Sequence, residues 1–395
     1  MNQRKIIFGI TICAFVVACA FIAHATRILP PYAEAQTIAE GAQDFEVLSQ
    51  RFAELAEKKG AAYAFDVLRI TDLQPNTDTH LLGHVIGDIL YKQKGVEGIA
   101  LCTQEFRNAC SHTIAIGALE EFGGEAALPR IREACHKAPG GPGAYTMCYH
   151  GLGHGVFAFY GYDLAKTVAF CKKTGTPEYH DREYIECVSG AIMELVGGGG
   201  HDKELWQKAR DKYFDPHDLF SPCLSSVIPK VTKPLCIIYI VPQIYAAEGI
   251  NLGSPDPTLF PAALRRCESL PITELRNACY QGFGSEFPIM TVDRDARRVD
   301  ALTSEQAHLV FTWCALAGKG QTECFLSALR AVFWGGENDP AASLRLCAAA
   351  DATPDLEHAC YTHLAEQMHK YLKPDARVSW CTQLPPDAQA PCAQR

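Results

Sequence analysis

The chain has 395 residues, of which 48% are hydrophobic and 21% charged, so it is long enough and apolar enough to bury a sizeable core. This composition excludes a largely disordered protein. The formal net charge of −9, with no basic cluster along the chain, excludes the positively charged surface that nucleic-acid binding needs, and we expect no nucleic-acid partner.

The N-terminal segment predicts export and membrane attachment. Arg4 and Lys5 precede an uncharged apolar run over residues 6–25, which is long enough to cross a bilayer as a helix. Positive charge before such a run keeps the N-terminus in the cytoplasm and exports the rest of the chain. Three fates are open: the run stays as an anchor, it is cleaved near Ala23, or Cys19 is lipidated. All three place the remainder in the periplasm or the extracellular space, and we expect the anchor.

Cysteine spacing is a second indication of export. Two of the 18 cysteines lie in the apolar run, and the other 16 fall in chain order as close pairs. Members of a pair are 8 to 16 residues apart, whereas successive pairs are 21 to 36 residues apart. The pairs are Cys102/Cys110, Cys135/Cys148, Cys171/Cys187, Cys223/Cys236, Cys267/Cys279, Cys314/Cys324, Cys347/Cys360 and Cys381/Cys392. This pattern predicts eight sequential disulfides; because Cys-x-x-Cys does not occur, a zinc ribbon, a thioredoxin-type site or a c-type haem attachment is not indicated.

Residues 28–76 are expected to form a linker and leading helices. Two successive prolines at its start break any helix that continues from the apolar run. Apolar residues at three- and four-residue spacing then predict helix from about residue 33 to residue 70, divided at Gly60. Asp78 is the expected N-cap of the helix that follows.

Residues 77–395 repeat one plan. An apolar-periodic segment ends at the first cysteine of a pair, a polar loop follows, and the second cysteine opens another apolar segment, as in residues 127–135 and 148–161. First cysteines recur every 33 to 52 residues, the scale of two-helix repeats. We therefore predict an all-α fold: an α-solenoid of about eight αα-hairpin repeats, each pinned by a disulfide, behind one transmembrane helix in residues 1–27.

In repeat length and paired cysteines, residues 78–395 resemble the cysteine-rich, Sel1-like and tetratricopeptide-like repeat proteins of bacterial envelopes. The resemblance implies a stack of helical hairpins. The glycine, alanine and tyrosine signatures of those repeats are not in register in this chain, so the resemblance implies no functional residue.

A recurring histidine motif predicts the functional site. His-x-Leu-Gly-His occurs twice, at residues 80–84 and 150–154, and a Cys-x-His sequence ends at both His112 and His150. A step of four residues places both histidines of a motif on one helix face. Neither motif carries the Glu of His-Glu-x-x-His, so a zincin protease is not indicated.

The first three repeats can be aligned on Asp78, Cys110 and Cys148, where Asp78 takes the place of the second cysteine in the first repeat. In this alignment the polar side chains fall two, six and ten residues after the reference position, and we call this set the histidine column. The column comprises His80, His84, His112, His150, His154, Asp88 and Glu120. Nitrogen-rich ligation favours zinc, copper or iron over calcium and magnesium. We predict one or two transition-metal ions on this column, with Asp88 or Glu120 as a ligand or a proton acceptor.

Three functions are compatible with this pattern. The first is a membrane-anchored extracytoplasmic metalloprotein, a metal-dependent hydrolase or oxidoreductase among the options. The second is an envelope scaffold that binds a protein or peptide partner on the solenoid surface and uses its histidines for packing or pH sensing. The third is a haem protein with two histidine ligands. Clustering of the column in the first three repeats favours a site over a general binding surface.

Overall fold

The structure, a computed structural model, describes residues 31–41, 44–74, 77–102, 105–139, 141–197, 203–215, 217–292, 299, 301–335, 339–372 and 374–394. These residues confirm an all-α fold, and their β contact is a single isolated bridge between Asp215 and Asp218. The α-helices are α2 (Phe45–Lys59), α3 (Ala61–Ile70), α4 (Thr79–Lys94), α5 (Glu105–Phe122), α6 (Gly124–His136), α7 (Gly141–Phe159), α8 (Leu164–Cys171), α9 (Arg182–Gly197), α10 (Lys203–Tyr213), α11 (Ser221–Leu224), α12 (Lys233–Ala247), α13 (Phe260–Arg265), α14 (Thr273–Met290), α15 (Ser304–Ala315), α16 (Gln321–Gly335), α17 (Pro340–Ala348), α18 (Pro354–Tyr371), α19 (Pro374–Cys381) and α20 (Pro386–Gln394). Short 3₁₀ helices are η1 (Gly95–Leu101), η2 (Lys230–Thr232), η3 (Pro257–Leu259), η4 (Arg266–Ser269) and η6 (Gly318–Gly320).

Local sequence signals explain where the leading helices begin and end. The Asp44 carboxylate caps α2 by accepting from the backbone N–H of Glu46 at 2.7 Å. Gly60, with φ of 95°, divides α2 from α3 as expected, since this backbone conformation suits glycine. The Asp78 carboxylate caps α4 by accepting from the N–H of Leu81 at 3.0 Å, again as expected.

All eight cysteine pairs predicted from spacing are disulfides. Their Cα–Cα distances lie between 5.4 and 5.8 Å, within the normal range for this cross-link. The pairing is sequential throughout, so each disulfide closes a local loop and none joins distant parts of the chain.

The position of the second cysteine differs from the prediction. It does not open its helix: α7 begins seven residues before Cys148, and α14 begins six residues before Cys279. The polar residues that were expected to be loop form the first turns instead, where acidic side chains such as Glu274 stabilise a helix N-terminus. Each disulfide therefore joins the end of one helix, often short, to the second or third turn of a longer one.

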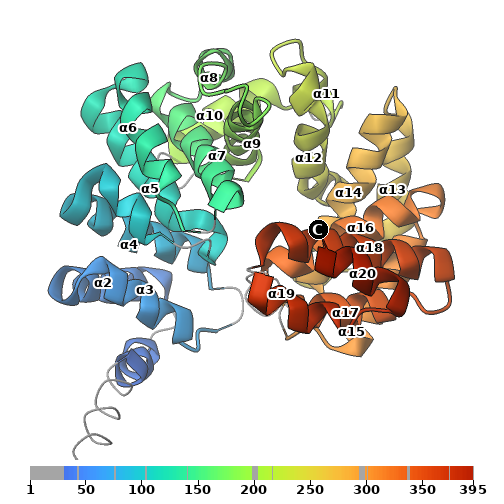
Figure 1. The fold of residues 1–395 in the computed structure, drawn as a ribbon. Helices are drawn as coiled ribbons and strands as arrows, with labels where there is room; N and C mark the ends of the chain where they lie inside the picture. Colours follow the sequence, from blue (N-terminus) through green and yellow to red (C-terminus); the bar gives the residue numbers. More distant parts are fainter. Residues whose placement is uncertain are drawn as a thin grey trace, which may run out of the picture.

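The long helices pack in one row, each against the next. The row runs α4, α5, α7, α9, α12, α14, α16, α18 and α20, with shorter helices such as α6 and α8 packed at its flank. In Figure 1 this row describes an arc from the blue N-terminal helices through green α9 to the red C-terminal helices. The arc returns on itself, because a Cβ added at Gly143 in α7 would lie 2.8 Å from the Tyr371 ring at the end of α18.

Glycines set the close spacing of the row. A Cβ at Gly153 would overlap the carbonyl oxygen of Cys187, and one at Gly190 would overlap that of His150. Gly284, far from any histidine column in the sequence, makes the same approach to the carbonyl oxygen of Cys324. These glycines therefore serve helix packing throughout the chain and do not by themselves mark a functional site.

Replacing Gly153 by alanine is expected to destabilise the protein by about 1–3 kcal/mol, because α7 and α9 must separate to accommodate the methyl group. Gly197→Ala is the matched control: Gly197 ends the neighbouring helix with open space around its Cα, so this change should leave stability unchanged or raise it by up to about 1 kcal/mol. Urea unfolding followed by circular dichroism measures both. Equal stabilities for the two variants would contradict this account of the packing.

In the part of the chain that the structure describes, no helix is both long and apolar enough to span a bilayer. The anchor expected in residues 1–27 lies outside the described residues.

Candidate metal centre

The five histidines of the predicted column come together in space. His80 and His84 lie on α4, His112 on α5, and His150 and His154 on α7, and these three helices are neighbours in the row. His112 is central: its ring centroid lies 5.3 and 5.8 Å from those of His80 and His84, and 6.0 and 4.8 Å from those of His150 and His154. The equal offset of the histidines from Asp78, Cys110 and Cys148 in the sequence thus places their rings close together in space.

Three of these imidazoles converge on one point. The Nε2 atoms of His80 and His84 are 3.1 Å apart, and one ring nitrogen from each of His80, His84 and His112 falls in a group whose members all lie within 4.8 Å of one another. Two nitrogens bound tetrahedrally to one zinc ion at about 2.0–2.1 Å are about 3.3 Å apart. The first pair already has nearly this separation, and His112 has to approach by about 1 Å or more to complete the set.

A backbone carbonyl orients His80. The Phe106 carbonyl oxygen lies 2.6 Å from His80 Nδ1, and because a carbonyl can only accept, Nδ1 carries the proton. His80 Nε2 therefore accepts the hydrogen bond from His84 Nε2–H at 3.1 Å, and its lone pair points to the position where an ion would replace that proton. Phe106 has φ of 53°, an uncommon conformation for a non-glycine residue, and lies inside the loop of eight residues closed by Cys102 and Cys110. The disulfide thus restrains the backbone that sets the tautomer of a candidate ligand.

Two buried carboxylates that the sequence interpretation missed contact the histidines of α7. Glu194 Oε2 lies 3.0 Å from His154 Nδ1, and Glu186 Oε2 lies 3.5 Å from His150 Nδ1. Both glutamates come from α9, and their side chains are at most 9% exposed. Metal-bound histidines usually donate their second N–H to such an oxygen, and the hydrogen bond between His154 Nδ1 and Glu194 would direct Nε2 of His154 toward an ion. The contact of His150 with Glu186, by contrast, is too long or misaligned for a hydrogen bond.

These two glutamates could have been found in the sequence by a spacing that is shifted relative to that of the histidines. Glu186, Gly190 and Glu194 recur every four residues and share the face of α9 that Gly190 presses against the His150 carbonyl. That face lies at positions −1, 3 and 7 relative to Cys187, whereas the histidine column lies at positions 2, 6 and 10. Each helix in the row contacts the preceding helix with one face and the following helix with another. The contact between α7 and α9 therefore combines the histidine positions of α7 with the shifted glutamate positions of α9.

His112 is the electrostatic centre of the cluster. It is 1% exposed, and within the described residues neither of its ring nitrogens has a hydrogen-bond partner. Burial, followed by the charges of the four surrounding imidazoles, holds the pKa of His112 well below its ordinary value, so the ring is neutral and can offer a lone pair. Leaving such a group unsatisfied typically costs about 1–3 kcal/mol, a cost that a bound ion would remove.

Charges around Glu186 keep it ionised. Burial alone would raise the pKa of this carboxyl group, but His150 and Arg182, whose Nη2 lies 2.6 Å from Glu186 Oε1, hold the pKa below its ordinary value. A negative charge therefore persists behind His150 at neutral pH.

Asp88 and Glu120 do not join the converging ligand atoms. Both side chains are exposed, and neither belongs to the His80, His84 and His112 group. The reason is helical drift: eight residues beyond the first histidine position correspond to about 800° of rotation, which is about 80° away from the starting face. The third position of the column therefore lies on a helix face that points away from the neighbouring helix.

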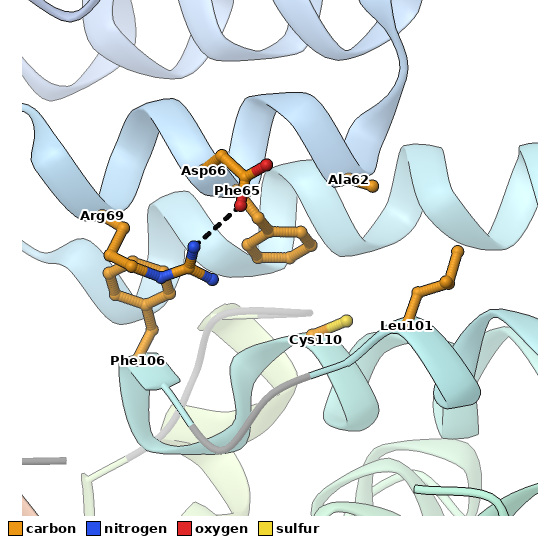
Figure 2. A pocket seen from close by; sticks show the side chains of 7 residues that line it. All are labelled: Ala62, Phe65, Asp66, Arg69, Leu101, Phe106 and Cys110. Carbon is orange, nitrogen blue, oxygen red and sulfur yellow. Dashed lines mark hydrogen bonds and ion pairs between the residues drawn. The ribbon is translucent and has the colours of Figure 1, made fainter. Parts of the chain in front are cut away.

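A pocket with a volume of about 130 Å³ shares Phe106 with this centre. Figure 2 shows the side chains that line it. Helix α3 forms one wall, where Asp66 and Arg69 make an ion pair at 2.7 Å. The rings of Phe65 and Phe106 stack with centroids 6.3 Å apart and give the pocket an apolar interior. It is lined by Ala62, Phe65, Asp66, Arg69, Leu101, Phe106 and Cys110. A molecule of a few heavy atoms is the largest that such a volume admits.

No known protein family matches the chain, and no curated protein or solved structure is similar to it. Its function is therefore inferred from the site, because a helical fold by itself does not specify one.

Proposed function

We propose that this protein is an extracytoplasmic metal-binding protein that holds a transition-metal ion between His80, His84 and His112. The observation that carries the proposal is the convergence of three imidazole nitrogens within 4.8 Å, two of them 3.1 Å apart. The Phe106 carbonyl supports it, because it orients His80 with Nε2 directed at the shared point.

Three imidazoles favour zinc, copper or iron and leave a fourth coordination position open. That combination is typical of catalytic sites, in which the open position takes water or substrate. His80 and His84 are half-buried, so the open position would face solvent on the side of α4. These features support metal-assisted hydrolysis or oxygen chemistry on a small substrate.

We also propose an extracytoplasmic, membrane-anchored location for the protein. Eight disulfides support an oxidising compartment, and the apolar run before residue 26 supports a membrane anchor. The row of long helices supports an α-solenoid of disulfide-pinned hairpins, comparable with the Sel1-like and tetratricopeptide-like envelope proteins.

The haem alternative fits the geometry less well than a single ion. Two axial imidazoles stand on opposite faces of a porphyrin, which separates their nitrogens by about 4 Å with the macrocycle between them. Here the Nε2 atoms of His80 and His84 are 3.1 Å apart, and the ring of His112 contacts both imidazoles. The rings thus occupy the volume that a macrocycle would need.

The test is metal analysis of the full-length chain produced in an oxidising compartment. The protein is stripped with a chelator, reconstituted separately with Zn²⁺, Cu²⁺ and Fe²⁺, desalted and analysed by mass spectrometry. We expect at least one ion to be retained per chain for one of these metals. Failure to retain any of them would refute the proposal and favour the protein-binding scaffold, in which the histidines serve packing.

A further inference from the structure

The histidines are arranged two, one and two, with His112 in the middle. The imidazoles of α4 lie on one side of the His112 ring and those of α7 on the other, with all four ring centroids 4.8 to 6.0 Å from that of His112. Neither His112 nitrogen has a hydrogen-bond partner among the described residues, although the ring is 1% exposed. One ion beside the α4 pair would satisfy only one of these nitrogens.

The spacing of the rings is similar on both sides. Three imidazoles on one tetrahedral ion have ring centroids about 5 Å apart, given a metal–nitrogen distance of about 2 Å. The set of His80, His84 and His112 has centroid distances of 4.5, 5.3 and 5.8 Å. The set of His112, His150 and His154 has distances of 4.8, 5.2 and 6.0 Å. The second set differs in ring orientation. Among the described residues the ring nitrogens converge only in the first set, and because His112 and His154 lie 21° from parallel, their rings must turn to share an ion.

The second side carries the negative charge that an additional cation needs. Glu194 lies 3.0 Å from His154 Nδ1 and Glu186 lies 3.5 Å from His150 Nδ1, so both carboxylates stand behind candidate ligands. Arg182 neutralises part of this charge through Glu186. A divalent ion on neutral imidazoles would otherwise be buried without compensation, which is costly.

We propose that His112 bridges two metal ions, one held with His80 and His84 and the other with His150 and His154. This inference rests on the proposed function, which supplies the first ion. When the second ion binds, the N–H proton of His112 passes to solvent and the ring becomes an imidazolate bonded through both nitrogens. The ions would lie about 6 Å apart across the ring, and nitrogen ligation of this kind suits Cu²⁺ and Zn²⁺.

Copper loading of the full-length chain tests the bridge, because an imidazolate couples the spins of two Cu²⁺ ions magnetically. We expect two copper ions per chain by mass spectrometry, with a low-temperature electron paramagnetic resonance signal that accounts for less than half of them. Two ions per chain with full signal intensity would overturn the bridge. One ion per chain would overturn the second site and leave the proposed function intact, whereas no retained copper, zinc or iron would refute both.

Variants of the two α7 ligands separate the sites and leave His112 in place. Because His150 and His154 are themselves buried, circular dichroism must first show that their double variant keeps its helix content. The double change of His150→Ala and His154→Ala should reduce the stoichiometry from two ions to one and restore full signal intensity. His358→Ala is the matched control, since this histidine is exposed on α18 and should leave both quantities unchanged. A double variant that keeps two ions would overturn the proposal.

Discussion

Replacing both His80 and His84 by alanine is expected to weaken binding of the first ion by about 10²–10⁴-fold. Loss of a hydrogen-bond partner of a metal ligand typically lowers metal affinity by about 10- to 100-fold, and we take this as the contribution of each of the two ligands. These two imidazoles provide two of the three converging nitrogens, including the pair separated by 3.1 Å. Competition of the stripped protein with a chromophoric Zn²⁺ chelator measures the affinity. The single variants should each show a part of the loss.

Folding is the control for this result. His80 and His84 are half-buried on the first turns of α4, so their removal should change stability much less than removal of a core residue. Circular dichroism should show native helix content and a similar unfolding midpoint in the double variant. His358→Ala, which removes an exposed imidazole, should retain the parental affinity. An unchanged affinity in a folded double variant would show that the ion, if bound, uses other ligands.

Reduction of the disulfides is expected to abolish cooperative folding at 37 °C. Each of the eight bonds closes a loop of 8 to 16 residues and restricts the unfolded chain, which contributes about 2–3 kcal/mol per bond at these lengths. Together these contributions exceed the stability of about 5–15 kcal/mol that is typical of folded proteins. Thermal unfolding with and without a thiol reductant, followed by circular dichroism, measures the difference.

The oxidised form of the reductant serves as the control for nonspecific effects, and alkylation with mass spectrometry verifies that the thiols were released. A fully alkylated sample that still melts cooperatively near the parental temperature would show that helix packing alone maintains the fold. It would also remove one argument for an oxidising compartment.

The spacing of residues along the chain was sufficient to predict the disulfides and the pairs of histidines, because both depend on local geometry. A disulfide between Cys135 and Cys148 needs only that a short loop brings two nearby residues together, so separation in the sequence predicts it. The motif of His150 and His154 likewise needs only the four-residue period of a helix, and an equal offset from each cysteine aligned it with His112. These are properties of single hairpins.

The tertiary structure decided which groups surround those histidines. Glu186 and Glu194 lie 36 and 40 residues beyond His150 and His154, and they contact them because α9 turns its opposite face toward α7. The Phe106 carbonyl reaches His80 through a backbone conformation that no residue type specifies. The sequence by itself therefore determined that the chain is helical, which cysteines are cross-linked and which five histidines come together, because these follow from local periodicity. Only packing decided the outer partners and the burial of each ligand, because these depend on how neighbouring helices face one another.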